Sequence, residues 1–297
     1  MSTLGLMQLL FAALALVMAG QGLSMRWDDF RRLWVERHAV LLAAVLQLVF
    51  LPLVALALAT VLSLPSAFAV GLMLLAAAPG SLTSSVYSHV FGGDVVLSAT
   101  LTGVNTLVSI VTLPFITGWA MLHFAAGPEV APSIVGKVLE VMVILVVPVG
   151  LGMAVGSRAP AFAARAERPM RVFSLLVLAT LCVVAVVKER QALVNGIDEV
   201  GFSVVLFNLV ALAVGYLVPR ALKMHEPAAV SIAYHLGVRS SVLAMFVAMT
   251  ALQNTQMALP AAVYSVTMIL FAIAFGIGVR GASRRRVSPG AQARPPS

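Results

Sequence analysis

Residues Ala76–Ser85 read AAAPGSLTSS, a helix-breaking stretch that interrupts a run of apolar residues. The preceding residues Leu72–Ala78 are apolar enough to lie in lipid, but Pro79 and Gly80 then break the run. A backbone group left unpaired in a bilayer costs several kcal/mol, so irregular backbone at membrane depth occurs only where protein or a watery cavity surrounds it. The stretch therefore predicts a discontinuous helix beside a site.

A second interruption lies late in the chain, where His235–Ser241 reads HLGVRSS. Ser84-Ser85-Val86 at the first interruption matches Ser240-Ser241-Val242 at the second. Two interrupted hydrophobic segments in corresponding positions of two halves are typical of the binding site of a secondary transporter. We therefore expect two inverted repeats, residues 1–122 and 135–280, whose broken helices cross at mid-membrane.

The composition is that of an all-α polytopic membrane protein. The chain has 297 residues, of which 61% are hydrophobic and 10% are charged, whereas a soluble domain carries roughly 25% charged residues. The single cysteine, Cys182, excludes an internal disulfide and a thiolate metal cluster. The net charge of +8 comes from basic residues between hydrophobic runs, without interleaved aromatic residues, so no nucleic-acid partner is expected.

Apolar runs of about 18 residues or more mark membrane spans. Nine are expected, at 4–24, 38–61, 67–91, 95–122, 135–157, 171–187, 200–219, 228–252 and 257–279. With nine spans, the strongly basic connections share one side, and they carry Arg26, Arg31, Arg32, Arg37, Arg158, Arg165, Arg168, Arg171, Arg220 and Lys223. The positive-inside rule then places the N-terminus outside and the C-terminus in the cytoplasm. The expected location is the inner membrane of the cell. Residues 281–297 are expected to form a disordered basic tail.

Several stretches resemble the bile acid:sodium symporter family. Gly71–Ile116 is similar to the first crossover region of that family, Gly22–Trp34 to its first cytoplasmic loop, and Gln47 with Leu51-Pro52 to a QxxxxP-like span. The resemblance implies a single transporter domain over residues 1–280 in the family's nine-helix form. It also implies a core of spans within 38–122 and 200–280, and a panel of spans within 4–24 and 135–187.

The resemblance further implies two sodium sites. The first would use Ser84, Ser85, Ser98, Thr102 and His235; the second would use Gln47, carbonyl groups near Leu236 and Val238, and the side chains at positions 235 and 239. The family pattern at the second interruption is roughly E-x-G-x-Q/H-N, where this chain has HLGVRS. Replacing a carboxylate by imidazole and adding a guanidinium turns attraction for sodium into repulsion. The sequence therefore argues against sodium coupling by the family's arrangement.

The sequence predicts a secondary active transporter of a small organic anion that works by alternating access in a lipid bilayer, with proton-coupled or facilitated transport. The alternatives are a sodium-coupled symporter that uses the remaining hydroxyl and carbonyl ligands, and a non-transporting sensor with the same fold. An enzyme is not expected, because the sequence shows no paired-Asp, HExxH, Ser/His or Ser/Lys constellation at membrane depth. No cofactor is expected apart from sodium or a proton as the coupling ion. The hypothetical substrate-binding residues are Arg239, His235, Asn105, Ser240, Pro79 and Gly80.

Several of these residues have a structural interpretation beside the functional one. Arg239 either binds the acidic group of a substrate or bonds the carbonyl groups of a broken helix. His235 either couples transport to protons or is a core histidine. Asn105 either lines the cavity or joins helices. Asp94, after two glycines, is interpreted as the N-cap of the span at 95–122, with a role in gating as the alternative.

Overall fold

A computed structural model describes residues 3–24, 36–81, 83–125 and 131–287 of the chain. The expected basic residues Arg26, Arg31 and Arg32 lie outside these residues. All regular elements in the described part are helical, with one isolated backbone bridge. The elements are α1 (Thr3–Ser24), α3 (Arg37–Val45), the π-helical turn Leu46–Phe50, α4 (Leu51–Val61), α5 (Ser66–Ala77), α6 (Thr83–Val90), α7 (Val95–Ala120), the π-helical turn Met121–Ala125, α8 (Ala131–Arg158), α9 (Pro160–Lys188), α10 (Arg190–Ala221), α11 (Glu226–Gly237), α12 (Ser241–Phe246), the π-helical turn Val247–Ala251, the 3₁₀ turn Gln256–Ala258 and α13 (Leu259–Val287).

Four helical segments of the described residues are long and apolar enough to cross a membrane. They are Arg37–Val61, Val95–Phe124, Asp198–Ala221 and Gln256–Gly281. Other apolar helices are shorter, such as Ser66–Ala77 and Ser241–Ala251, because the chain breaks beside them. The fold is therefore that of an all-helical, multi-pass membrane protein, while the count of nine spans and the inverted repeats stay predictions.

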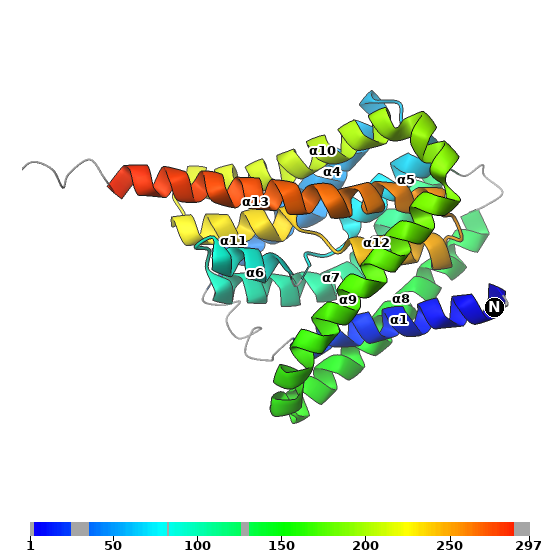
Figure 1. The fold of residues 1–297 in the computed structure, drawn as a ribbon, viewed down its shortest axis with the longest axis horizontal. Coiled ribbons are helices and arrows are strands. Elements are labelled where there is room, and N and C mark those ends of the chain that lie inside the picture. The colour runs from blue at the N-terminus through cyan, green and yellow to red at the C-terminus, as the bar shows by residue number, and fades with distance from the viewer. Residues whose placement is uncertain (1–2, 25–35, 82, 126–130, 288–297) are drawn as a thin grey trace, which may run out of the picture.

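Both expected interruptions break a helix. The first break separates α5 from α6, and the second separates α11 from α12. Pro79 contributes to the first break because its backbone has no N–H to donate to a helix. The second break is shorter than the expected His235–Ser241 segment, because α11 continues through His235 to Gly237. Along the chain, each broken helix lies between two long helical segments, Arg37–Val61 and α7 in the first half and α10 and α13 in the second (Figure 1).

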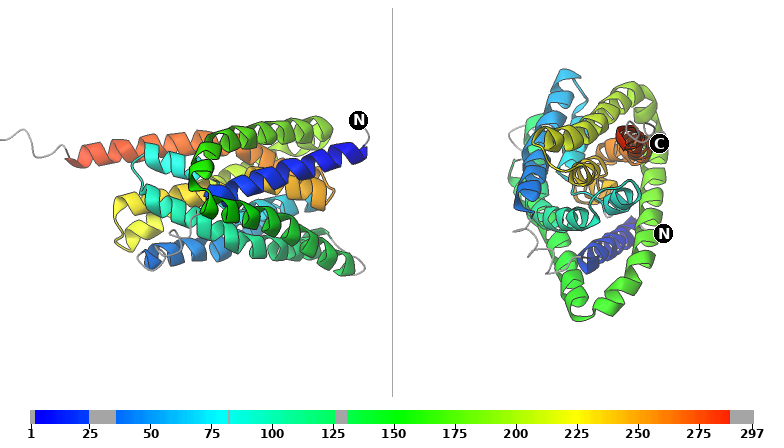
Figure 2. Two further views of the ribbon diagram at one scale, coloured as in Figure 1. Left: turned by 90° about the horizontal axis from the view of Figure 1, so that it is seen from below. Right: turned by 90° about the vertical axis from the view of Figure 1, so that its left-hand side faces the viewer.

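Helices α1, α8 and α9 lie together along one side of the bundle (Figure 2). Contact between α1 and α8 is close at Gly22 and Gly152, where a Cβ atom would meet the backbone of the opposite helix. Small residues allow helix backbones to approach in this way in membranes, where packing rather than water drives association. At the other end of the chain, α13 continues to Val287, so residues 281–287 of the tail expected at 281–297 are helical, and residues 288–297 lie outside the described residues.

Asp94 is the N-cap of α7, as the sequence predicts. Its carboxylate accepts a hydrogen bond from the Leu97 N–H at 3.0 Å. Its backbone N–H donates to the Pro227 carbonyl at 3.1 Å, and its carbonyl accepts from the Ser231 hydroxyl at 2.7 Å. The start of α7 is thereby fixed to α11, so the cap positions elements of both halves.

Replacing Asp94 by alanine is expected to lower the free energy of unfolding by about 0.5–2 kcal/mol, because an N-cap acceptor is lost. Asp94→Asn retains a cap oxygen and is expected to keep most of that stability. Thermal unfolding of the purified variants measures both effects. Normal stability with lost transport in Asp94→Asn would instead support a gating role for the negative charge.

Candidate functional site

The two helix breaks pair with each other through their backbones. Gly80 and Arg239 form an antiparallel bridge. The Ser81 N–H donates to the Val238 carbonyl at 2.8 Å, and the Ser240 N–H donates to the Pro79 carbonyl at 2.9 Å. Each break thus satisfies backbone groups that the other leaves free, as unwound backbone at membrane depth requires.

Four of the expected substrate-binding residues meet at this crossing. They are Pro79, Gly80, Arg239 and Ser240, and all four are buried. Since they lie far apart in the sequence and belong to different halves, the crossing is a tertiary feature. Their burial closes the crossing to solvent in this conformation.

The Arg239 side chain is fully buried and uses all five of its N–H groups within the protein. Its Nε donates to the Leu75 carbonyl at 2.9 Å. One terminal nitrogen, Nη1, donates to Gln47 Oε1 at 2.9 Å and to the Leu236 carbonyl at 3.4 Å. The other, Nη2, donates to the carbonyls of Ala76, at 2.5 Å, and Ala78.

These acceptors form what we call the oxygen cage: the carbonyl oxygens of Leu75, Ala76, Ala78 and Leu236, and Gln47 Oε1. Three of the carbonyls lie at the C-terminal end of α5, where the partial negative charge of the helix favours a cation. None of the five acceptors is a carboxylate. The arrangement matches the structural interpretation of Arg239, in which it bonds the carbonyl groups of a broken helix.

Side chains from the long helical segments before and after the breaks also bond the ends of the broken helices. Gln47, in the π-helical turn before α4, donates to the Ala78 carbonyl at 3.0 Å. In the second half, Asn208 of α10 donates to the Gly237 carbonyl at 3.0 Å, and Tyr264 of α13 donates to the same oxygen at 2.7 Å. Sequence reasoning missed Asn208 and Tyr264, although a lone amide within the apolar run at 200–219 is a detectable signal.

Four hydroxyl residues on α6 and α7 form what we call the hydroxyl cluster: Ser85, Ser88, Ser98 and Thr102. The Ser98 hydroxyl lies 3.1 Å from that of Ser85 and accepts from that of Ser88 at 3.3 Å. Thr102, one turn further along α7, donates to the Ser98 carbonyl at 2.9 Å. Ser88 was not predicted, although its spacing of three residues from Ser85 places both on one helix face.

His235 connects α11 to α7. Its Nε2 atom lies in hydrogen-bond contact with the side-chain amide of Asn105, which follows Thr102 by one turn. Both side chains are buried, and neither His235 Nδ1 nor Asn105 Oδ1 has a hydrogen-bond partner among the described residues. The same holds for the buried hydroxyls of Ser84 and Ser241. Since most buried polar atoms are paired, such a group of unpaired ones beside the breaks indicates a site for a ligand or ion.

Gly80 packs directly against the imidazole ring. A Cβ atom at this position would lie 2.6 Å from His235 Cε1 and 2.7 Å from Nδ1. We therefore expect Gly80→Ala to force the ring or the break aside and to lower the free energy of unfolding by about 1–3 kcal/mol. Thermal unfolding measures the loss.

The matched control is Gly278→Ala on α13, where a new Cβ atom meets nothing within 4 Å. This control is expected to unfold at or above the wild-type temperature, since alanine favours a helix. Equal melting temperatures for Gly80→Ala and Gly278→Ala would contradict the close packing at the break.

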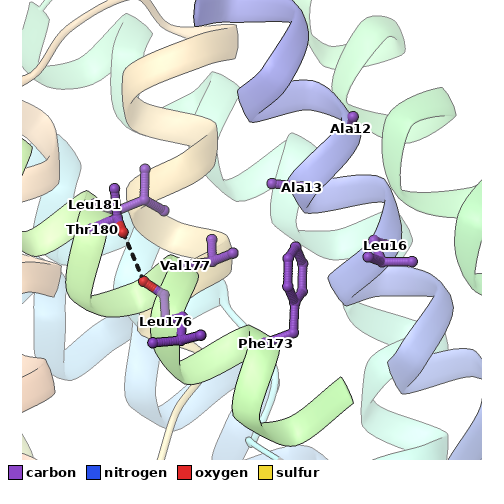
Figure 3. A pocket seen from close by; sticks show the side chains of 8 residues that line it. All are labelled: Ala12, Ala13, Leu16, Phe173, Leu176, Val177, Thr180 and Leu181. Atoms are coloured by element: carbon purple, nitrogen blue, oxygen red, sulfur yellow. Dashed lines mark hydrogen bonds between the residues drawn. The ribbon is translucent and has the colours of Figure 1, made fainter. Parts of the chain in front are cut away.

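An apolar pocket lies apart from the residues above, between α1 and α9 (Figure 3). Its volume is about 420 Å³, and its lining residues are Ala12, Ala13, Leu16, Phe173, Leu176, Val177, Thr180 and Leu181. The one hydroxyl in the lining, that of Thr180, donates to the Leu176 carbonyl at 2.9 Å within its own helix. The pocket therefore suits an apolar group and offers nothing to bind an acidic one.

Comparison with known families decides the class of the protein. The sequence pattern of the Sodium Bile acid symporter family matches residues 11–196, which include the first break, the hydroxyl cluster and Gln47. This chain belongs to the sodium bile acid symporter family. Its members are transporters, so the protein is a membrane transporter and not an enzyme. The second break, with His235 and Arg239, lies beyond the matched residues.

Individual relatives agree with this family. An uncharacterized sodium-dependent transporter of Bacillus subtilis is 28% identical over 253 residues, which cover 85% of this chain and 77% of that protein. A probable chloroplastic sodium/metabolite cotransporter of rice, BASS2, is 26% identical over 257 residues, covering 86% of this chain and 60% of its own. The mouse P3 protein is 26% identical over 238 residues, which cover 79% of this chain and 50% of that protein. The chain thus spans less than two thirds of the rice protein and half of the mouse protein.

Proposed function

We propose that this family member is a secondary transporter that carries a small organic anion across the membrane by alternating access at the paired breaks, coupled to one sodium ion. The observation that carries the proposal is the pairing of two broken helices from opposite halves of the chain, joined by Ser81 and Ser240. Secondary transporters place substrate and ion sites where discontinuous helices meet.

The electrostatics of the crossing favour an anion. Arg239 brings a fixed positive charge, and none of its partners is acidic. Because its N–H groups are already used, Arg239 contributes charge rather than a direct bond in this conformation. Direct bonds to the anion come from donors without a partner among the described residues, namely the Ser241 hydroxyl and Nδ1 of His235, whose Nε2 atom contacts the Asn105 amide.

The hydroxyl cluster is the proposed site of the coupling ion. Its oxygens are neutral and hard, which suits sodium better than a soft metal. Ser84 lies next to Ser85 and brings a further buried hydroxyl. The names of two relatives include sodium, and we therefore prefer the sodium-coupled alternative to proton coupling through His235.

Two features of the fold support alternating access. Helices α1, α8 and α9 form a group that corresponds to the expected panel, and the remaining helices surround the crossing (Figure 2). Gln47 bonds the end of α5 as Asn208 bonds the end of α11, which supports the proposed inverted repeats. We propose that the panel moves against the core and exposes the crossing to each side in turn.

The orientation is proposed from the basic residues. The α10–α11 connection and the C-terminal end of α13 lie on the left in Figure 1, and the α8–α9 connection lies at the bottom of the same view. Arg158, Arg220, Lys223 and Arg280 lie at or near these places. The positive-inside rule then puts these places in the cytoplasm and the N-terminus outside, with the protein in the inner membrane.

Ligand-dependent melting tests the substrate class. A ligand that binds only the native protein raises its melting temperature. We expect small acids such as pantoate, or larger amphipathic ones such as taurocholate, to stabilise the purified protein, and their uncharged amides or alcohols to have no effect. Stabilisation by the neutral compounds as strongly as by the acids would contradict an anion site.

A further inference from the structure

We infer that Arg239 is a built-in cation: its guanidinium occupies a cation site formed by the oxygen cage, so that sodium cannot bind there. The oxygens of the cage alone could hold one dissolved cation. Because the guanidinium takes that place, the number of coupled sodium ions is lower by one. The inference that the guanidinium occupies the cage rests on the hydrogen bonds of Arg239 alone. Only its consequence for the number of coupled ions rests on the proposed function.

The oxygens of the cage converge from three separate segments on one positive group. They come from the C-terminal end of α5, the last turn of α11 and the π-helical turn that carries Gln47. Carbonyl groups of unwound backbone and the C-terminal ends of half-helices are the groups that coordinate sodium in secondary transporters. Without the guanidinium, this convergence of neutral oxygens would be a site for a free cation.

The guanidinium fills this site in both geometry and charge. Five N–H groups meet five acceptor oxygens, and Gln47 Nε2 makes a further bond to the Ala78 carbonyl. A sodium ion would have to displace these bonds and approach a like charge in a poorly screened interior. The family name implies sodium, but the residues at this particular place do not fit it.

The hydroxyl cluster differs from the cage in this respect. Among the described residues, the hydrogen-bond partners of its hydroxyl groups are neutral: Ser85 and Ser88 bond Ser98, and Thr102 bonds the Ser98 carbonyl. The nearby Ser84 hydroxyl has no partner among the described residues. The two places therefore have different occupants: a dissolved cation at the hydroxyl cluster and a side-chain cation in the oxygen cage.

Melting temperatures in sodium and in choline at equal ionic strength test the inference on purified protein. We expect Arg239→Gln to melt well below the wild type in choline and to gain an extra sodium-dependent rise of about 3 °C or more. Arg239→Lys is the matched control. It keeps a cation in the cage and is expected to show only the sodium shift of the wild type. An equal sodium shift in Arg239→Gln and in the wild type would overturn the inference.

A second variant keeps the test decisive if Arg239→Gln does not fold. Gln47→Met removes one oxygen of the cage and leaves the guanidinium in place. We expect it to melt at a lower temperature with the sodium shift unchanged, because sodium does not use Gln47. A reduced sodium shift in Gln47→Met would show that sodium enters the cage and would overturn the inference. Since the readout needs no transport, failure of the proposed function leaves this test intact.

Discussion

A disulfide between α9 and α13 is expected to reduce transport to the background level. Cys182 is the only cysteine of the chain, and its Sγ atom lies 3.2 Å from Ser265 Oγ. Ser265→Cys places a second sulfur at this position, within reach of a disulfide after a small adjustment. Because α9 belongs to the proposed panel and α13 to the proposed core, the bond prevents their relative motion. Uptake by reconstituted liposomes, measured after oxidation and again after reduction, reports the loss and its recovery.

The double variant Cys182→Ala/Ser265→Cys provides the control, because it carries one thiol and cannot form this bond. It is expected to transport equally well before and after oxidation. Wild-type uptake by fully cross-linked protein would show that α9 and α13 move together. In that case the division into a moving panel and a core would be wrong.

Ser98→Ala is expected to raise the sodium concentration required for half-maximal uptake by about tenfold or more, the size of effect found when groups that support metal ligands are removed. Ser98 is fully buried and its hydroxyl connects Ser85 and Ser88. Its loss removes an oxygen from the hydroxyl cluster and leaves two others without their partner. Uptake of a labelled anion measured against sodium concentration gives the shift.

Ser231→Ala is the matched control for this variant. Ser231 is an equally buried serine, but its hydroxyl donates to the Asp94 carbonyl, away from the hydroxyl cluster. It is expected to leave the sodium dependence unchanged. A tenfold shift in both variants would indicate a general effect on the fold, and no shift in Ser98→Ala would place the coupling ion elsewhere.

The position of the first break could be predicted from local sequence, because proline lacks an N–H group and Pro79-Gly80 lies within an apolar run. The second break was predicted too long, since His235 and Gly237 remain helical. Its start is fixed by distant side chains, Asn208 and Tyr264, which bond the Gly237 carbonyl. Such contacts between separate helices do not change the hydrophobic periodicity of either segment, so the sequence alone does not predict them.

The partners of Arg239 show a similar limit of sequence reasoning. The sequence shows that a buried arginine in an apolar span needs acceptors, and it offers no acidic partner nearby. It does not show that the acceptors are carbonyl groups of α5, more than 160 residues earlier. The hydroxyl cluster was partly predictable, because Ser98 and Thr102 lie one turn apart, whereas the contact of Ser98 with Ser88 depends on how α6 packs against α7.

Sodium-driven uptake by purified protein in liposomes tests the central claim most directly. With sodium higher outside, we expect a labelled organic anion to accumulate above its equilibrium concentration, with a simple hyperbolic dependence on sodium because one ion is coupled. The gradient is then replaced by an equal one of choline, or by a proton gradient, and accumulation is expected to stop. Equal accumulation with the proton gradient alone, or no uptake of any anion under any gradient, would contradict a sodium-coupled anion transporter.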